Sequence, residues 1–151
     1  MSSGFRLQNH KKVIYLTPKL WTFYDYGEGG TNYIEDWYRS VSEEAQFLFD
    51  DILKQNQKIE VPRYWVSSRP LSGGELKGHQ LWEFRFFEGD IQHRVIGTFG
   101  DFRKQAVLLL GCYHKMKVYT PRDALTTARK RATNYRDGKA RIYERKVKTD
   151  Q

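Results

Sequence analysis

The sequence is short of cysteine and of long apolar runs, and each shortage excludes a class of protein. Cys112 is the single cysteine among 151 residues, so no disulfide can form within the chain and a disulfide-stabilised scaffold is excluded. No apolar run approaches the roughly 20 residues that a membrane helix needs, and residues 1–12 lack the apolar stretch of a secretory signal. These shortages favour a cytoplasmic protein without a membrane segment.

Acidic residues are also in short supply relative to basic ones. The chain has 18 Asp and Glu against 26 Lys and Arg, which gives a formal net charge of +8. Such an excess favours an acidic partner, of which nucleic acid is the commonest. Hydrophobic residues make up 39% and aromatic residues 15% of the chain, enough for one packed domain. We expect that domain at 13–140, between a flexible tail at 1–12 and a basic tail at 141–151.

The hydrophobic pattern predicts a strand, two helices, three strands and a last helix. Residues 34–52 repeat apolar side chains at helical spacing, and Ser40 with Glu43 forms a candidate capping box between two helices. Thr120 is the expected N-cap of the last helix, with Pro121 at its first position. The expected strands are 21–26, 80–87, 91–99 and 105–113, and the last helix is 120–135. We expect the helices to cover one face of the sheet and the opposite face to be polar and basic.

The hairpin between 80–87 and 91–99 can be aligned by the parity of its side chains. A two-residue turn at Glu88-Gly89, or equally at Gly89-Asp90, keeps the aromatic side chains of both strands on one face. A three-residue turn would move Arg94 onto that apolar face, where an unpaired guanidinium is costly. We therefore expect Arg85 and Arg94 on the opposite, polar face, together with Glu83 and Gln92.

This order of elements resembles the RelE/ParE toxin superfamily, in particular its HigB-like, phage-derived branch. The matching stretches are YIEDWYRSVSEEAQ, LWEFRF, HRVIGTF and LLLGCYHKMKVYTPRDALTTARKR, which together span roughly residues 21–135. The resemblance implies an α+β, RelE-like fold. In that fold an antiparallel sheet, made of an N-terminal strand and a three-stranded meander, carries the N-terminal helices on one face and a C-terminal helix follows.

The resemblance also implies a function and a set of site residues. It implies the toxin of a type II toxin–antitoxin system, an endoribonuclease that cuts mRNA on the ribosome and is neutralised by an antitoxin of the helix-turn-helix type. The RNA's own 2′-hydroxyl would attack the neighbouring phosphate. The resemblance matches Arg85, Arg94, Lys115 and Tyr119 to functional positions of the family. With the residues that their chemistry and position add, the candidate catalytic residues are Arg85, Arg94, His114 and Tyr119, and the candidates for RNA or phosphate binding are Lys77, Lys115, Lys117, Arg122 and Arg129.

Several alternatives stay open at this point. Glu83 stands where ribosome-dependent relatives have a lysine, so the general base is unassigned. His114 is as plausible as a hydrogen-bonded structural residue as it is as a proton carrier, and the arginines could be solvated strand residues. A non-catalytic toxin-fold or basic RNA-binding module that docks to its target is the alternative function. Four scattered histidines and one cysteine show no ligand spacing, so neither a metal nor another cofactor is expected.

Overall fold

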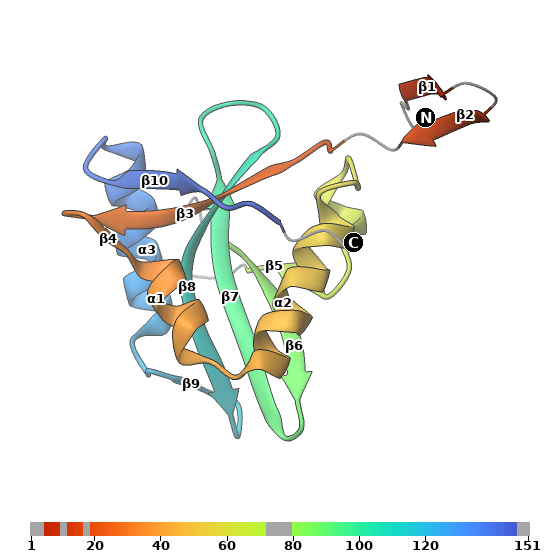
Figure 1. Ribbon diagram of the computed structural model, residues 1–151. Helices are drawn as coiled ribbons and strands as arrows, with labels where there is room; N and C mark the ends of the chain where they lie inside the picture. Colours follow the sequence, from red (N-terminus) through yellow and green to blue (C-terminus); the bar gives the residue numbers. More distant parts are fainter. Residues whose placement is uncertain (1–4, 10–11, 17–18, 72–79, 148–151) are drawn as a thin grey trace.

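The computed structural model describes residues 5–9, 12–16, 19–71 and 80–147 (Figure 1). No helix in these ranges is both long and apolar enough to cross a membrane. The elements in chain order are β1 (Phe5–Asn9), β2 (Lys12–Leu16), β3 (Thr22–Glu28), β4 (Thr31–Asn32), α1 (Tyr33–Ser40), α2 (Glu43–Asn56), a 3₁₀ turn (Pro62–Tyr64), β5 (Ser68–Pro70), β6 (Trp82–Glu88), β7 (Ile91–Phe99), β8 (Gln105–Lys115), β9 (Val118–Thr120), α3 (Ala124–Arg136) and β10 (Arg141–Glu144).

The main sheet corrects the expected RelE-like fold class. It has eight strands in the order β10-β3-β8-β7-β6-β5, with β4 paired to β3 and β9 paired to β8. It is a mixed sheet, because β3 runs parallel to β8 while the other pairs are antiparallel. The expected three-stranded meander is present as β6-β7-β8, but the α+β fold has more strands than a RelE-like sheet. β1 and β2 pair with each other in a separate two-stranded sheet.

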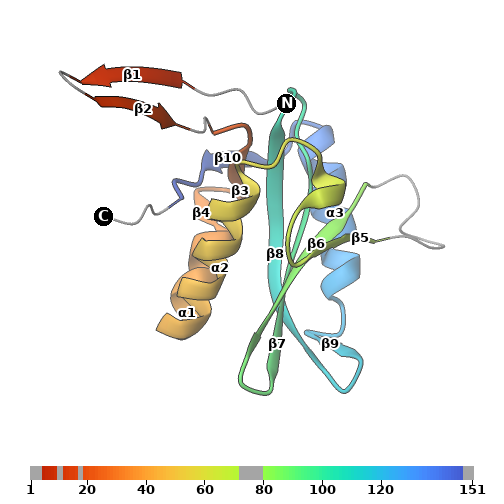
Figure 2. The ribbon, with the colours of Figure 1, turned by 90° about the vertical axis from the view of Figure 1, so that its right-hand side faces the viewer.

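Helices cover both faces of the main sheet, whereas the sequence predicted all helical cover on one face. Figure 2 shows α1 and α2 on one side and α3 on the other. The face under α1 and α2 carries an aromatic core that includes Phe23, Trp65, Trp82 and Phe84. The other core packs Ile96, Val107 and Leu109 against the alanines of α3. The small alanine side chains let α3 lie close to the sheet. Figure 2 shows that α3 does not extend to the ends of β6, β7 and β8 near the β6–β7 turn.

The helix starts differ from those that the sequence predicted. Asn32 caps α1, because its side-chain oxygen accepts from the backbone N–H groups of Ile34 at 3.1 Å and Glu35 at 2.9 Å. Ser42 caps α2 by accepting from Ala45 N–H at 3.1 Å, so the expected cap at Ser40 is wrong by two residues. The cap of α3 is Asp123 rather than Thr120, because Val118–Thr120 pairs with β8 before the helix begins.

The β6–β7 hairpin confirms the predicted parity and selects one of its two registers. Glu88 pairs with Ile91, so Gly89-Asp90 forms the turn, and Arg85 pairs directly with Arg94. Gly89 has a φ of +57°, a conformation that favours glycine. Since directly paired residues of an antiparallel ladder share a face, Arg85 and Arg94 project from the same side of the sheet, as predicted.

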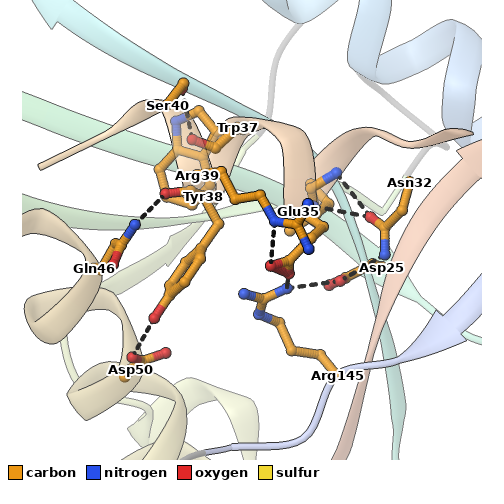
Figure 3. Close-up of polar contacts among 11 residues, drawn as sticks. Asp25, Asn32, Glu35, Trp37, Tyr38, Arg39, Ser40, Gln46, Asp50 and Arg145 are labelled. Atoms are coloured by element: carbon orange, nitrogen blue, oxygen red, sulfur yellow. Dashed lines mark hydrogen bonds and ion pairs between the residues drawn. The ribbon is translucent and has the colours of Figure 1, made fainter. Parts of the chain in front are cut away.

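A buried ion cluster ties the C-terminal segment to the rest of the domain (Figure 3). Arg145 Nη1 lies 2.7 Å from Asp25 Oδ2 and 3.1 Å from Glu35 Oε2, so it links β3 to α1. Its guanidinium also lies over the Tyr38 ring, at 4.5 Å from the centroid. Asp25 is 2% exposed, and this burial raises the pKa of its carboxyl although Arg145 opposes the rise. The cluster positions β10, which lies within the part that the sequence marked as a basic tail.

Candidate functional site

A polar cluster centred on Glu83 lies on the sheet face that α3 leaves partly open. The Glu83 side chain is fully buried, and its Oε1 accepts hydrogen bonds from Arg69 Nε at 2.7 Å and from Arg94 Nη1. Its Oε2 accepts from the Tyr119 hydroxyl at 3.0 Å. One carboxylate therefore holds two guanidinium groups and a phenol in fixed positions.

Arg94 extends the cluster toward the ends of β7 and β8. Its Nη2 donates to Gln92 Oε1 at 2.6 Å and lies 3.3 Å from His114 Nδ1. The His114 and Tyr119 rings meet edge to face, with 4.8 Å between their centroids. Arg94 has both Nη groups occupied and is 4% exposed, so it lies beneath His114 and Tyr119 instead of at the surface.

Strand register explains why residues far apart in sequence converge here. Arg69 on β5 pairs with Glu83 on β6, while Gln92 on β7 pairs with His114 on β8, which in turn pairs with Tyr119 on β9. Together with the pairing of β6 and β7, these pairings place the side chains on one face of the sheet in adjacent rows. The rigid sheet fixes their spacing without help from a loop.

The cluster sets the protonation states of its two titratable rings. Burial, reinforced by the Glu83 carboxylate, raises the pKa of Tyr119 to about 12, so its phenol stays protonated at neutral pH. Burial, reinforced by the Arg94 charge, lowers the pKa of His114 below its usual 6.5. Because a guanidinium can only donate, Nδ1 facing Arg94 is the acceptor nitrogen of a neutral imidazole.

Positive charge is in excess on this face. Arg69 and Arg94 share the one carboxylate of Glu83, and in the described part of the chain the Arg85 side chain has no hydrogen-bond or ion-pair partner. The half-exposed Arg69 and the partly exposed Arg85 are therefore accessible cations beside a neutral histidine. A phosphate group fits such a surface because guanidinium forks match its oxygens.

The remaining predicted RNA-binding residues lie around this site at different distances from it. Lys115 and Lys117 are exposed at the turn between β8 and β9, and Arg122 is exposed just before α3. Arg129 is half-buried on α3, and Lys77 lies outside the described residues. Of the four residues predicted as catalytic, the structure brings Arg94, His114 and Tyr119 into contact and places Arg85 beside Arg94.

Sequence reasoning missed one member of the cluster and gave two others no role. Arg69 falls in a stretch with no regular pattern, so nothing in the sequence predicts its pairing with Glu83. Gln92 and Glu83 were expected on the polar face by parity, but parity cannot show that both contact Arg94. Cys112 is buried, which raises the pKa of its thiol to about 12 and makes it a poor nucleophile. Among the described residues, no three His, Cys, Asp or Glu side chains are grouped to hold a metal ion.

No family model, curated protein or solved structure matches this chain.

Proposed function

We propose that the protein is an endoribonuclease that cleaves mRNA on the ribosome and acts as the toxin of a toxin–antitoxin pair. The observation that carries the proposal is the contact between Arg94, His114 and Tyr119 over the buried Glu83. It combines a neutral histidine with nearby guanidinium groups, which is what attack of a hydroxyl on a phosphodiester requires.

The proposed reaction uses the RNA's own 2′-hydroxyl as the nucleophile. Arg85 and Arg69 bind the oxygens of the scissile phosphate. The contact between Arg94 and His114 is long, at 3.3 Å, so the approaching 2′-hydroxyl displaces the Arg94 hydrogen from the Nδ1 lone pair of His114. Nδ1 then takes the 2′-hydroxyl proton while the 2′ oxygen bonds to phosphorus. The bond to the 5′ oxygen breaks, that oxygen takes a proton from water, and the hydroxide left behind takes the proton from His114, which returns the imidazole to its neutral form.

Glu83 and Arg94 act in this scheme by positioning other groups. Both are buried, and their hydrogen bonds fix His114 and Tyr119 against each other. Tyr119 keeps its proton because its pKa is raised to about 12, so its phenol serves as a hydrogen-bonded wall of the site and not as a base. This assigns the general base, which the sequence left open, to His114.

The test is cleavage of ribosome-bound mRNA, with free RNA in parallel, by the full chain. The scheme predicts products that end in a 2′,3′-cyclic phosphate and a 5′-hydroxyl, and induced expression should arrest growth with new mRNA 5′ ends. His114→Ala should lower the rate by about a hundredfold or more. Tyr119→Phe should lower the rate more than the matched control Tyr64→Phe, because the Tyr64 side chain is exposed on the 3₁₀ turn and makes no contact with the Glu83 cluster.

Burial of Arg94 favours a second function, a non-catalytic RNA-binding module. Its Nη1 and Nη2 groups are occupied by Glu83 and Gln92 and its Nε is buried, so Arg94 offers no accessible pair of N–H groups to a phosphate. In that case Arg85, Lys115 and Lys117 bind RNA phosphates and no bond is broken. RNA binding with no cleavage of free or ribosome-bound RNA would decide for this function and against the nuclease.

A further inference from the structure

A pocket of about 760 Å³ lies on the sheet face opposite the Glu83 cluster, near the C-terminal end of α1. Its volume is typical of a site for a small organic ligand. Its walls come from the end of α1, the β6–β7 turn and the lower part of β8, and they include Trp37, Ser42, Glu88, His93, Tyr113 and Lys115. Figure 1 shows α1 lying across β8 above this region.

Two aromatic side chains give the pocket flat apolar walls. The Trp37 ring packs directly on the backbone of Gly111, where an added Cβ would come within 2.2 Å of the ring. Glycine at this position therefore lets the indole lie flat against the strand. Tyr113, two residues further along β8, is 41% exposed. Flat aromatic surfaces of this kind bind nucleobases by stacking.

The polar wall of the pocket presents a charged hydrogen-bond acceptor. Glu88 accepts from His93 Nε2 at 2.9 Å and from the Ser42 hydroxyl. These two bonds lower the pKa of the Glu88 carboxyl and keep it ionised. Each of its oxygens can accept a further bond. His93 is 6% exposed and its Nδ1 is buried, so the Glu88 carboxylate is the acceptor that this wall presents to a ligand.

We propose that this pocket binds a guanine base of the RNA substrate. Guanine presents two adjacent N–H donors, N1–H and the exocyclic amine, on its Watson–Crick edge, and a carboxylate such as Glu88 can accept both. Adenine and cytosine offer one exocyclic amine there and uracil one ring N–H, so none supplies the adjacent pair. Asp90 on the same turn adds negative charge to this side of the pocket, which disfavours a phosphate inside it and favours the donor edge of a base.

The position of the pocket connects it to the proposed cleavage site. His114 and Lys115 line its rim, while the His114 ring also contacts Arg94 and Tyr119 of the Glu83 cluster. A strand of RNA that passes over the turns at this end of the sheet can place a phosphate at Lys115 and a guanine in the pocket. The inference rests on the proposed function only for the statement that the guanine belongs to RNA. Binding of a guanine base in the pocket does not depend on it.

The experiment measures binding of GMP, IMP, AMP, CMP and UMP to the full chain by isothermal titration calorimetry. GMP should bind at least about 10-fold more tightly than AMP, CMP or UMP, the discrimination expected of a bidentate contact. IMP, which lacks the exocyclic amine, should bind more weakly than GMP. Glu88→Gln should remove the preference for GMP, and Tyr113→Ala should weaken all five nucleotides together.

Glu44→Gln is the matched control, because Glu44 is exposed on α2 and does not line the pocket. It should leave GMP affinity unchanged, and thermal melting should show that every variant folds. Equal binding of all nucleotides, or a GMP preference that survives Glu88→Gln, overturns the inference. GMP binding by a protein that cleaves no RNA would keep the pocket and reject the nuclease. Cleavage of RNA without any GMP binding would keep the nuclease and reject the pocket.

Discussion

Replacing Glu83 by glutamine tests whether this buried carboxylate holds the candidate site together. The carboxylate is fully buried and is bonded to Arg94, which is itself 4% exposed. Glutamine has nearly the same shape and keeps an acceptor oxygen for one donor, but it carries no charge. The substitution therefore leaves the Arg94 guanidinium buried beside a neutral amide without its counter-charge.

The expected cost follows from how deeply each partner is buried. Breaking a buried ion pair by removing one partner typically costs about 3–5 kcal/mol. The Arg69 side chain is 48% exposed, so solvent screens its share of the interaction, and that share should stay below about 1 kcal/mol. Glu83→Gln should therefore lower the free energy of unfolding by about 3–5 kcal/mol, a large part of the 5–15 kcal/mol that stabilises a typical domain.

Urea denaturation followed by tryptophan fluorescence measures this cost and separates its origins. Arg69→Met alone should cost less than about 1 kcal/mol. Adding Arg94→Met to Glu83→Gln should restore part of the lost stability, because no unpaired buried charge then remains. The reasoning is refuted if Glu83→Gln costs less than about 1 kcal/mol, or if the double variant is as unstable as the sum of the single ones.

Three further predictions concern catalysis, RNA affinity and the anchoring of β10. Because the pKa of His114 is lowered from 6.5, its stabilising contribution should be complete above pH 6.5 and lost as pH falls through the lowered value. The cleavage rate should likewise rise with pH with its midpoint below pH 6.5, and a midpoint above pH 6.5 would contradict a His114 base. Arg85→Ala should reduce the slope of log affinity for RNA against log salt by about 1, whereas Arg103→Ala, at a side chain 85% exposed in the turn before β8, should change it little. Arg145→Met should lower the free energy of unfolding by about 3–5 kcal/mol in urea titrations, because Asp25 is left buried without its counter-charge. Arg141→Met on β10, where the side chain is exposed, is the control and should cost far less.

The local features of the sheet were predictable because they depend on alternating side chains. Trp82, Phe84 and Phe86 alternate with polar residues, and this period fixed both the β6–β7 pairing parity and the common face of Arg85 and Arg94. The register itself was not decided, because the turns at Glu88-Gly89 and Gly89-Asp90 give the same parity. Glycine at position 89 suits either turn.

The wider fold was not predictable for two physical reasons. β5, β9 and β10 have three or four residues each, too few for a periodic signal to stand out. β10 is also concealed by its basic composition, and it pairs with β3 more than a hundred residues earlier in the chain. The alanines of α3 indicate a helix but not the face that it covers, so the expectation of helices on one side of the sheet was wrong.

The parity argument was right about Arg94 for a reason different from the one that motivated it. An unpaired guanidinium is too costly to bury on the apolar face, and this cost alone led us to expect Arg94 on the polar face. The polar face proved to be buried at that point, and Glu83 supplies the counter-charge that makes burial tolerable. A sequence shows which residues share a face, but the depth of each residue depends on strands and helices that pack over it from far along the chain.

Burial of Arg94 divides the proposed site into an inner part and an outer part with different tasks. The inner part, Glu83 and Arg94, has its hydrogen bonds directed at neighbouring side chains, so substitutions there should disturb stability and the placement of His114 together. The outer part, Arg69 and Arg85, is accessible, so substitutions there should weaken RNA binding with little loss of stability. A nuclease needs both parts, because bound phosphate must meet a fixed base. A binding module needs only the outer part, since it never uses the geometry that the inner part maintains.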